Sequence, residues 1–420
     1  MVSMMKNTIN SFRFLKQILF QIFKNKISAV SNIKDARDAL RYSVQPLVRW
    51  AQLFDAAPFP IKAFSNNSAH CMRNLKLGMI CQAIWAGTLI AATSVSLVYK
   101  RRWRLDGLNV PFFTYVLYNM EIILGLLNCT IVHICCQWKR PRYDNVLNQM
   151  VSILNEFGKF GEEQDLVWLR YQFSKYLLVG GFYFVVIVAV DATYYWKVIV
   201  SVCTTGAYFV PNAVQFLSLL QYAYVVIFAY RKCRAVNAIL LAVRYSLRSN
   251  FKSYCSTIRT LRKQHMLLHR LVFQVNRDFG VLIILAVFSV LVAISITCLE
   301  MYQYTHEKTL NFSTIHYVIY SALWVLMYVC KLLIVLIPNH LMVNERDLTG
   351  MILQGLPLVE SKEFTNETLK FSRQVLLQKG PYTANGVFVL DLTLLVHIFG
   401  ALATYLVILI QFDQSPRIKN

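Results

Sequence analysis

The hydrophobic residues of this chain gather into long continuous runs instead of alternating with polar residues. Seven runs of roughly 20 residues or more lie near 77–98, 111–136, 176–200, 206–230, 280–302, 314–337 and 388–412. An α-helix needs about 20 apolar residues to cross roughly 30 Å of hydrocarbon. Because a lipid-exposed backbone must satisfy its own hydrogen bonds, such runs predict helices, and their continuity excludes a strand barrel. The pattern therefore predicts an all-α integral membrane protein with seven transmembrane helices.

Composition and charge agree with this class. Hydrophobic residues make up 56% of the 420 residues and charged residues only 15%, with a mean hydropathy of +0.45. These values are too apolar for a soluble globular domain of this length. The net charge of +22 raises the alternative of nucleic-acid binding. The basic residues are concentrated in alternate loops, however, which is typical of a membrane protein, so no nucleic-acid partner is expected.

The positions of the 43 Lys and Arg residues predict the orientation in the membrane. Of these residues, 34 lie in the N-terminal region and the loops on the same side, 8 lie on the other side, and Lys331 lies inside the sixth run. The positive-inside rule then places the N-terminus in the cytoplasm and the C-terminus outside. The segment 99–104 (YKRRWR) puts four cations on the predicted outer side, but the other loops outweigh it.

This topology divides the chain into one membrane domain with cytoplasmic extensions. Residues 1–76 form a cytoplasmic N-terminal region whose amphipathic segment either lies on the inner membrane surface or is disordered. Residues 77–337 contain the first six transmembrane helices, and residues 231–279 within them form helices that protrude into the cytoplasm. The predicted remainder consists of a cytoplasmic loop at 338–387, the seventh helix at 388–412 and an extracellular tail at 413–420.

Modification sites follow from the same orientation. Asn311, in the sequon NFS, lies in a predicted outer loop and is the expected glycosylation site, whereas Asn66 and Asn366 lie on the predicted cytoplasmic side. The ten cysteines have no CxxC spacing, so neither a disulfide framework nor a zinc site is expected. Cys135 and Cys136, at the inner end of the second helix, are candidates for palmitoylation.

Catalytic motifs are scarce in the sequence. His, Asp and Glu do not cluster with metal-ligand spacing, and neither a phosphate-binding loop nor a nucleophile elbow occurs. We therefore expect no enzyme activity, no cofactor and no metal. A proton-coupled secondary transporter is one alternative, although most intramembrane charges lie toward helix ends, where snorkelling or an ordinary buried pair explains them. These charges are Glu121, Asp191, Glu300, Lys331, Asp391 and His397.

Aromatic and polar side chains collect at the predicted outer ends of the helices. An aromatic belt at the membrane interface explains any single Tyr or Trp there. Acids and amides interleaved with the rings are more typical of a cavity that binds a small polar molecule by stacking and hydrogen bonding. The candidate ligand-binding residues are Tyr118, Trp196, Asn212, Glu300, Tyr320 and Trp324.

The last hydrophobic run carries a polar stripe. At 100° per residue, one narrow face holds Thr393, His397, Ala401, Thr404, Ile408 and Gln411. Such a stripe faces either other helices, to which it hydrogen-bonds, or the water of a pore. Polar groups alternating with small or branched residues favour the pore. Since one chain supplies one such helix, several copies would have to surround the pore.

The most specific motif lies in the same helix. Thr404-Tyr405, five aliphatic residues and Gln411-Phe412 match the TYhhhhhQF signature that ends the insect gustatory receptors, which the preceding segment, with Gly386 and Asp391, also resembles. The resemblance implies a ligand-gated non-selective cation channel in the plasma membrane of sensory neurons, opened by a small-molecule tastant and permeable to monovalent and divalent cations. It also implies a homo- or heterotetramer with other gustatory receptors, in which the seventh helix lines the pore. The pore and gate residues would then be His397, Thr404, Ile408, Gln411 and Phe412.

A G-protein-coupled receptor is the other alternative, and seven helices are its main support. The third helix does not end in an acidic-Arg-aromatic triplet, and the seventh contains no NPxxY motif. The charge distribution also places the two termini on the opposite sides from those of a coupled receptor.

Overall fold

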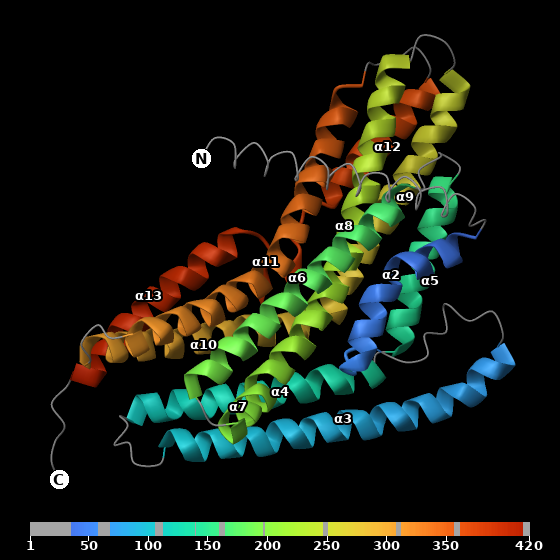
Figure 1. The fold of residues 1–420 in the computed structure, drawn as a ribbon. Coiled ribbons are helices and arrows are strands. Elements are labelled where there is room, and N and C mark those ends of the chain that lie inside the picture. Colours follow the sequence, from blue (N-terminus) through green and yellow to red (C-terminus); the bar gives the residue numbers. More distant parts are fainter. Residues whose placement is uncertain are drawn as a thin grey trace, which may run out of the picture.

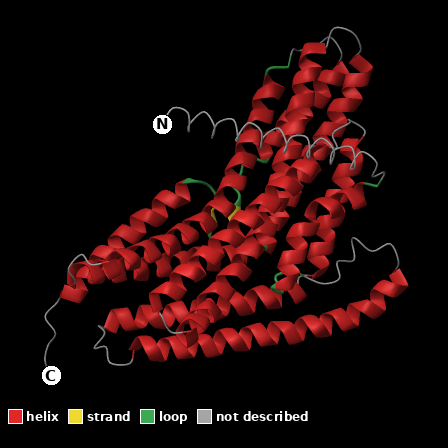
Figure 2. Cartoon of the chain, in the orientation of Figure 1, coloured by secondary structure: helices red, strands yellow, loops and turns green. Residues whose placement is uncertain are grey.

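The computed structural model describes residues 35–57, 68–105, 112–138, 140–158, 164–195, 198–246, 251–307, 312–356 and 362–414, and nearly all of them are helical (Figure 2). The long helices that correspond to the seven predicted runs are α3 (Ser68–Leu105), α4 (Phe112–Trp138), α6 (Gln164–Tyr195), α8 (Val210–Ser246), α10 (Gly280–Glu307), α11 (Phe312–Gln354) and α13 (Thr393–Gln414). The shorter elements are α2 (Ala36–Leu53), α5 (Arg140–Gly158), α7 (Val198–Thr204), the π-helical turn η2 (Thr205–Phe209), α9 (Phe251–Asp278), α12 (Lys362–Leu377), β1 (Thr383–Ala384) and β2 (Phe388–Val389).

The membrane-spanning character of the long helices is clear from their composition. Six of them contain an apolar stretch of at least 18 residues, and α3 contains a shorter one at Ala83–Tyr99. The predicted class, an all-α integral membrane protein with seven transmembrane helices, is thus confirmed. Which side of the membrane each end faces stays a prediction, and the N-terminal amphipathic segment and Asn311 lie outside the described residues.

Helix α8 occupies the centre of the molecule. Its membrane stretch, within Ser201–Arg244, is 83% buried by the rest of the chain. It packs against α4, α9, α11 and α2, and Figure 1 shows it running from the membrane bundle into the helical group formed with α9 and α12. The predicted protruding segment 231–279 corresponds to the end of α8 and to α9.

Helix α11 is the longest element and bends along its course (Figure 1). Pro338 lies inside this helix, where it cannot donate a backbone hydrogen bond. The neighbouring Asn339 is buried, and its amide donates to the carbonyl of Val335 at 2.8 Å. The second half of α11 continues past the bundle and packs against α12.

A short hairpin precedes the last helix. Strands β1 and β2 are antiparallel, with Thr383 opposite Val389 and Ala384 opposite Phe388. The turn between them has positive φ at Asn385 (49°) and Gly386 (78°), which is the geometry of a type I′ turn. Helix α13 therefore begins at Thr393, later than the predicted 388, because the first apolar residues of that run pair as strands. Asp391 caps the helix, accepting from the backbone N–H groups of Thr393 (3.0 Å) and Leu394 (3.3 Å).

Candidate ligand and pore sites

A group of polar side chains, here called the polar cluster, lies inside the membrane bundle. Lys331 of α11 is 1% exposed, and its ammonium donates to Gln215 Oε1 at 2.8 Å and to Asn212 Oδ1. Gln215 donates to Asn128 Oδ1 at 3.1 Å, and Asn128 donates to Ser289 Oγ at 2.6 Å. A buried cation in an apolar bundle is tolerated only when such acceptors replace its water. The cluster thus fixes α4, α8, α10 and α11 relative to one another.

Three intramembrane carboxylates each accept a hydrogen bond from a tyrosine hydroxyl. The pairs are Tyr208 with Glu121 (3.3 Å), Tyr320 with Asp191 (3.0 Å) and Tyr317 with Glu300 (2.8 Å). These bonds tie each acid to a neighbouring helix or turn.

A series of aromatic rings, here called the ring series, runs along α11 beside the polar cluster. The Trp324 ring lies 6.3 Å from Tyr320, 6.1 Å from Tyr328 and 6.0 Å from Tyr208, measured between ring centroids. The Tyr317 and Tyr320 rings are 6.5 Å apart. These separations suit edge-on and offset contacts, so the rings form one connected surface.

The indole N–H of Trp324 is the one exceptional polar group of this surface. Trp324 is 8% exposed, and its Nε1 has no hydrogen-bond partner among the described residues. A buried donor without an acceptor costs about 1–3 kcal/mol. Such a group is a natural contact for a ligand acceptor, since binding would supply the missing hydrogen bond.

A cavity adjoins the polar cluster and the ring series, and its empty volume is about 430 Å³ when its open mouth is counted. Its polar lining residues are Glu121, Asn128, Tyr208, Asn212, Gln215, Ser289 and Tyr328. Amides, a carboxylate and phenols around an apolar wall can orient a small polar molecule by hydrogen bonds and ring contacts. Among the described residues, no group of three or more His, Cys, Asp or Glu side chains could hold a metal.

The predicted ligand residues do not all lie at the cavity. Asn212 lines the cavity, whereas Tyr320 and Trp324 belong to the ring series next to it. Glu300 is linked to that series through Tyr317. The side chain of Tyr118 and the whole of Trp196 lie outside the described residues. The ligand role of all six stays a prediction.

Lys331 and Asn128 were missed as site residues by sequence reasoning. Lys331 interrupts an apolar run, which snorkelling explains equally well, and its two amide partners, Asn212 and Gln215, come from another helix, α8. The sequence signal that could have indicated the polar cluster is the presence of two amides, Asn212 and Gln215, three residues apart and thus on one face of α8.

The predicted pore helix lies at the edge of the subunit. Helix α13 packs against α10 and α4 through one face, on which Ile398 and Leu402 are buried, and its membrane stretch is only 17% buried. The predicted stripe is turned the other way, with Ala401 half-buried and the remaining members exposed: Thr393, His397, Thr404, Ile408 and Gln411. The Thr404 hydroxyl donates to the Gly400 carbonyl of its own helix at 3.0 Å. The side chain of Phe412 lies outside the described residues.

The hairpin before α13 is fixed to the protruding helices. Arg346 of α11 donates to the carbonyls of Gln378 (2.9 Å) and Gly380 (2.8 Å). Tyr382 is buried, and its hydroxyl lies 3.0 Å from His269 Nδ1 of α9. Burial and the charge of Arg346 lower the pKa of His269 to about 4. These contacts join the start of the last helix to α9 and α11.

Gly280 permits the hairpin to approach the start of α10. A Cβ atom at this position would lie 2.5 Å from the Asn385 side chain of the type I′ turn. The turn is therefore seated against the α9–α10 junction.

A model of the family described as 7tm chemosensory receptor matches residues 45–416. Among Drosophila melanogaster proteins, putative gustatory receptor 28b is 29% identical over 110 residues, which are 26% of this chain and 23% of that receptor. Gustatory receptor for sugar taste 43a is 27% identical over 159 residues, which are 38% and 36% of the two chains. Both matches thus span well under half of the curated relatives.

Solved structures extend the likeness over the whole fold. The olfactory receptor OR5 of Machilis hrabei, solved alone and in complex with eugenol, superposes with a TM-score of 0.62. The superposition covers 90% of this chain and 100% of the receptor at 10% sequence identity. At this identity the match shows a shared fold.

Proposed function

Because the chain belongs to the 7tm chemosensory receptor family, whose model matches residues 45–416, we propose that it is a gustatory receptor acting as a ligand-gated non-selective cation channel. It is a multi-pass membrane receptor; the proposed location is the plasma membrane of sensory neurons. The gustatory assignment is supported by the terminal TYhhhhhQF motif and by the similarity to Drosophila gustatory receptors, which include a sugar-taste receptor.

The proposed ligand is a small tastant that binds at the ring series and the adjoining cavity. The observation that carries this assignment is the buried, unpaired indole N–H of Trp324, whose ring contacts Tyr208 and Tyr328 of the cavity wall. An acceptor oxygen of the tastant would accept a hydrogen bond from the indole N–H, while Tyr320 and Tyr208 pack against its apolar faces. Asn212 and Glu300 supply further polar contacts at the two ends of this surface.

The proposed pore is formed by α13 from several copies of the chain or its relatives, most simply four. Polar groups exposed to hydrocarbon are unfavourable, so the stripe from Thr393 to Gln411 is expected to face water or a neighbouring subunit. In a symmetric ring the stripes would surround one axis, along which monovalent and divalent cations pass. Ligand binding at α11 would act on α13 through the helices on which the hairpin is seated.

The experiment is whole-cell recording from cells that express this chain, with sugars and bitter compounds applied in turn. Trp324→Phe keeps an aromatic ring, although a smaller one, and removes the indole N–H. The half-maximal concentration of the active tastant should therefore rise roughly 5- to 100-fold. The matched control is Trp138→Phe, since Trp138 is 86% exposed. An unchanged concentration dependence in Trp324→Phe, at normal surface expression, would remove the ligand assignment, and substrate uptake without channel currents would favour the transporter.

A further inference from the structure

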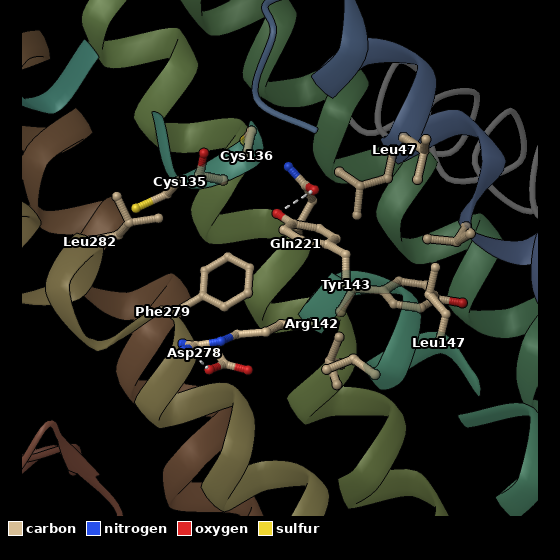
Figure 3. Close-up of a pocket in the computed structure, with 16 residues that line it drawn as sticks. Leu47, Cys135, Cys136, Arg142, Tyr143, Leu147, Gln221, Asp278, Phe279 and Leu282 are labelled. Carbon is tan, nitrogen blue, oxygen red and sulfur yellow. Dashed lines mark hydrogen bonds and ion pairs between the residues drawn. The ribbon is translucent and has the colours of Figure 1, made fainter. Parts of the chain in front are cut away.

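A second cavity lies where α2 and α5 cover one end of the membrane bundle. Its volume is about 810 Å³, including its open mouth. The walls come from α2, α4, α5, α8 and the α9–α10 junction, and most of the lining side chains are aliphatic or aromatic. Figure 3 shows these side chains converging on a common space. An apolar wall interrupted by a few polar groups is typical of cavities that hold small molecules.

Two polar pairs interrupt the apolar wall. Arg142 Nη1 donates to Asp278 Oδ1 at 3.0 Å, and the Arg142 side chain is 54% exposed. The Tyr143 hydroxyl donates to Oε1 of the buried Gln221 at 3.1 Å. In Figure 3 the ring of Phe279 lies between the two pairs. The ion pair therefore marks the side open to water, and the phenol and amide mark the enclosed side.

The hydrogen bonds already present decide which ligand group fits the enclosed side. The Gln221 amide nitrogen donates to the carbonyls of Ala56 and Leu217, which uses both of its N–H groups. The Tyr143 proton is directed to Gln221, and burial raises the pKa of this phenol, so it stays protonated. Both side chains can still accept a hydrogen bond through a remaining lone pair. A ligand hydroxyl can donate there.

A net charge on the ligand would be unfavourable in this cavity. Arg142 and Asp278 already compensate each other, and a charged ligand would have to separate them or lose its water without a partner. The rings of Phe279 and Tyr143, with centroids 6.0 Å apart, offer tilted faces to an aromatic or alicyclic body.

We propose that this cavity is a second binding site, for small uncharged alcohols with an apolar ring system, whose hydroxyl donates to Tyr143 or Gln221. The site is separate from the tastant site. Gln221 follows Gln215 of the polar cluster by six residues, about 9 Å along α8. Because α2 and α5 form part of its wall, an occupant would hold these helices against the bundle. The proposal does not depend on channel activity.

The test uses the full chain in lipid nanodiscs and the photoreactive probe 4-benzoylbenzyl alcohol. After irradiation and proteolysis, mass spectrometry should locate the probe on peptides that contain Tyr143 to Leu147 and Gln221 to Val225. The methyl ether of the same probe cannot donate a hydrogen bond. It should therefore need about fivefold higher concentration for half-maximal labelling.

Three variants sharpen the test. Tyr143→Phe removes one of the two acceptors and should reduce the difference between alcohol and ether without abolishing it, because Gln221 Oε1 can still accept. Val146→Phe and Val225→Phe fill the cavity from two different helices and should abolish labelling of its peptides. Leu178→Phe, at a residue that is 73% exposed on α6, is the control for an added ring.

Thermal melting of each variant separates loss of the site from loss of the fold. The wild-type labelling map and the alcohol-to-ether ratio require no substitution, so they test the proposal even if both filled variants misfold. Labelling found only outside the cavity, equal labelling by alcohol and ether in the wild type, or persistent labelling in a folded filled variant would overturn it.

Discussion

Helices α8 and α13 are both apolar enough to cross a membrane, yet the rest of the chain buries most of α8 and little of α13. The membrane stretch of α8 is 83% buried and that of α13 is 17% buried. The amides of α8 find their partners inside the subunit, as Gln215 does with Lys331 and Asn128. The polar side chains of α13 lie on its exposed face. Hydropathy thus identifies both spans, while the placement of polar groups shows that α8 completes the subunit and α13 needs surroundings beyond it.

The largest expected effect is the loss of Lys331 from the interior of the bundle. Lys331→Met would leave Asn212 and Gln215 with unpaired buried oxygens, so we expect a destabilisation of roughly 2–4 kcal/mol. The measurement is the melting temperature of the purified receptor and its amount at the cell surface. The control is Lys263→Met, at an exposed residue of α9. A wild-type melting temperature for Lys331→Met would show that the cluster does not hold the helices together.

Substitutions on the exposed face of α13 should affect the channel current and not the stability. Gln411→Ala and Phe412→Ala should leave folding and assembly intact but change the current, since an amide at a constriction replaces part of an ion's hydration and a large ring can close it. We expect altered selectivity for the first and a several-fold higher basal current for the second. If the stripe instead bonds neighbouring helices, surface expression should fall while conductance stays normal.

A smaller effect is expected from pH at the junction that holds α13 to the protruding helices. Burial, with the charges of His269 and Arg346, lowers the pKa of His265 to about 3, and that of His269 is about 4. Since the unfolded histidines have a pKa near 6.5, the junction should lose stability as pH falls from about 6.5 toward 4. The protection factors of residues 378–390 against hydrogen exchange, corrected for the pH dependence of intrinsic amide exchange, should fall over this range. The variant carrying His265→Gln and His269→Gln should show a flatter profile, and equal profiles would contradict the assignment.

The sequence predicted the spans well because each requires only a run of apolar residues. The family resemblance from Thr404 to Phe412 is likewise confirmed by the family match over residues 45–416. The start of α13 was misjudged because the paired strands β1 and β2 are apolar too, although the Asn385-Gly386 dipeptide is a turn signal. The polar cluster was not predictable, since Lys331, Asn128 and Ser289 meet only after four helices have packed.

The membrane orientation and Asn311 glycosylation stay predictions, as do the ligand and pore residues. Glycosidase treatment should change the gel mobility of the wild type and leave that of Asn311→Gln unchanged. Loss of glycosylation in Asn366→Gln instead would reverse the assigned sides of the membrane.

The most direct test of the account is the access of water to the exposed face of α13. Thr404→Cys and Ile408→Cys place thiols on the stripe, and Phe399→Cys places one on a different exposed face of the same helix. A charged, water-soluble methanethiosulfonate is applied during ligand-evoked current, with the wild type as the control for native cysteines. If the stripe of α13 lines the pore, the reagent should block the current irreversibly in the two stripe variants and leave wild-type current in Phe399→Cys. Unaltered current in both stripe variants, with normal surface expression, would contradict the assignment of α13 to the pore.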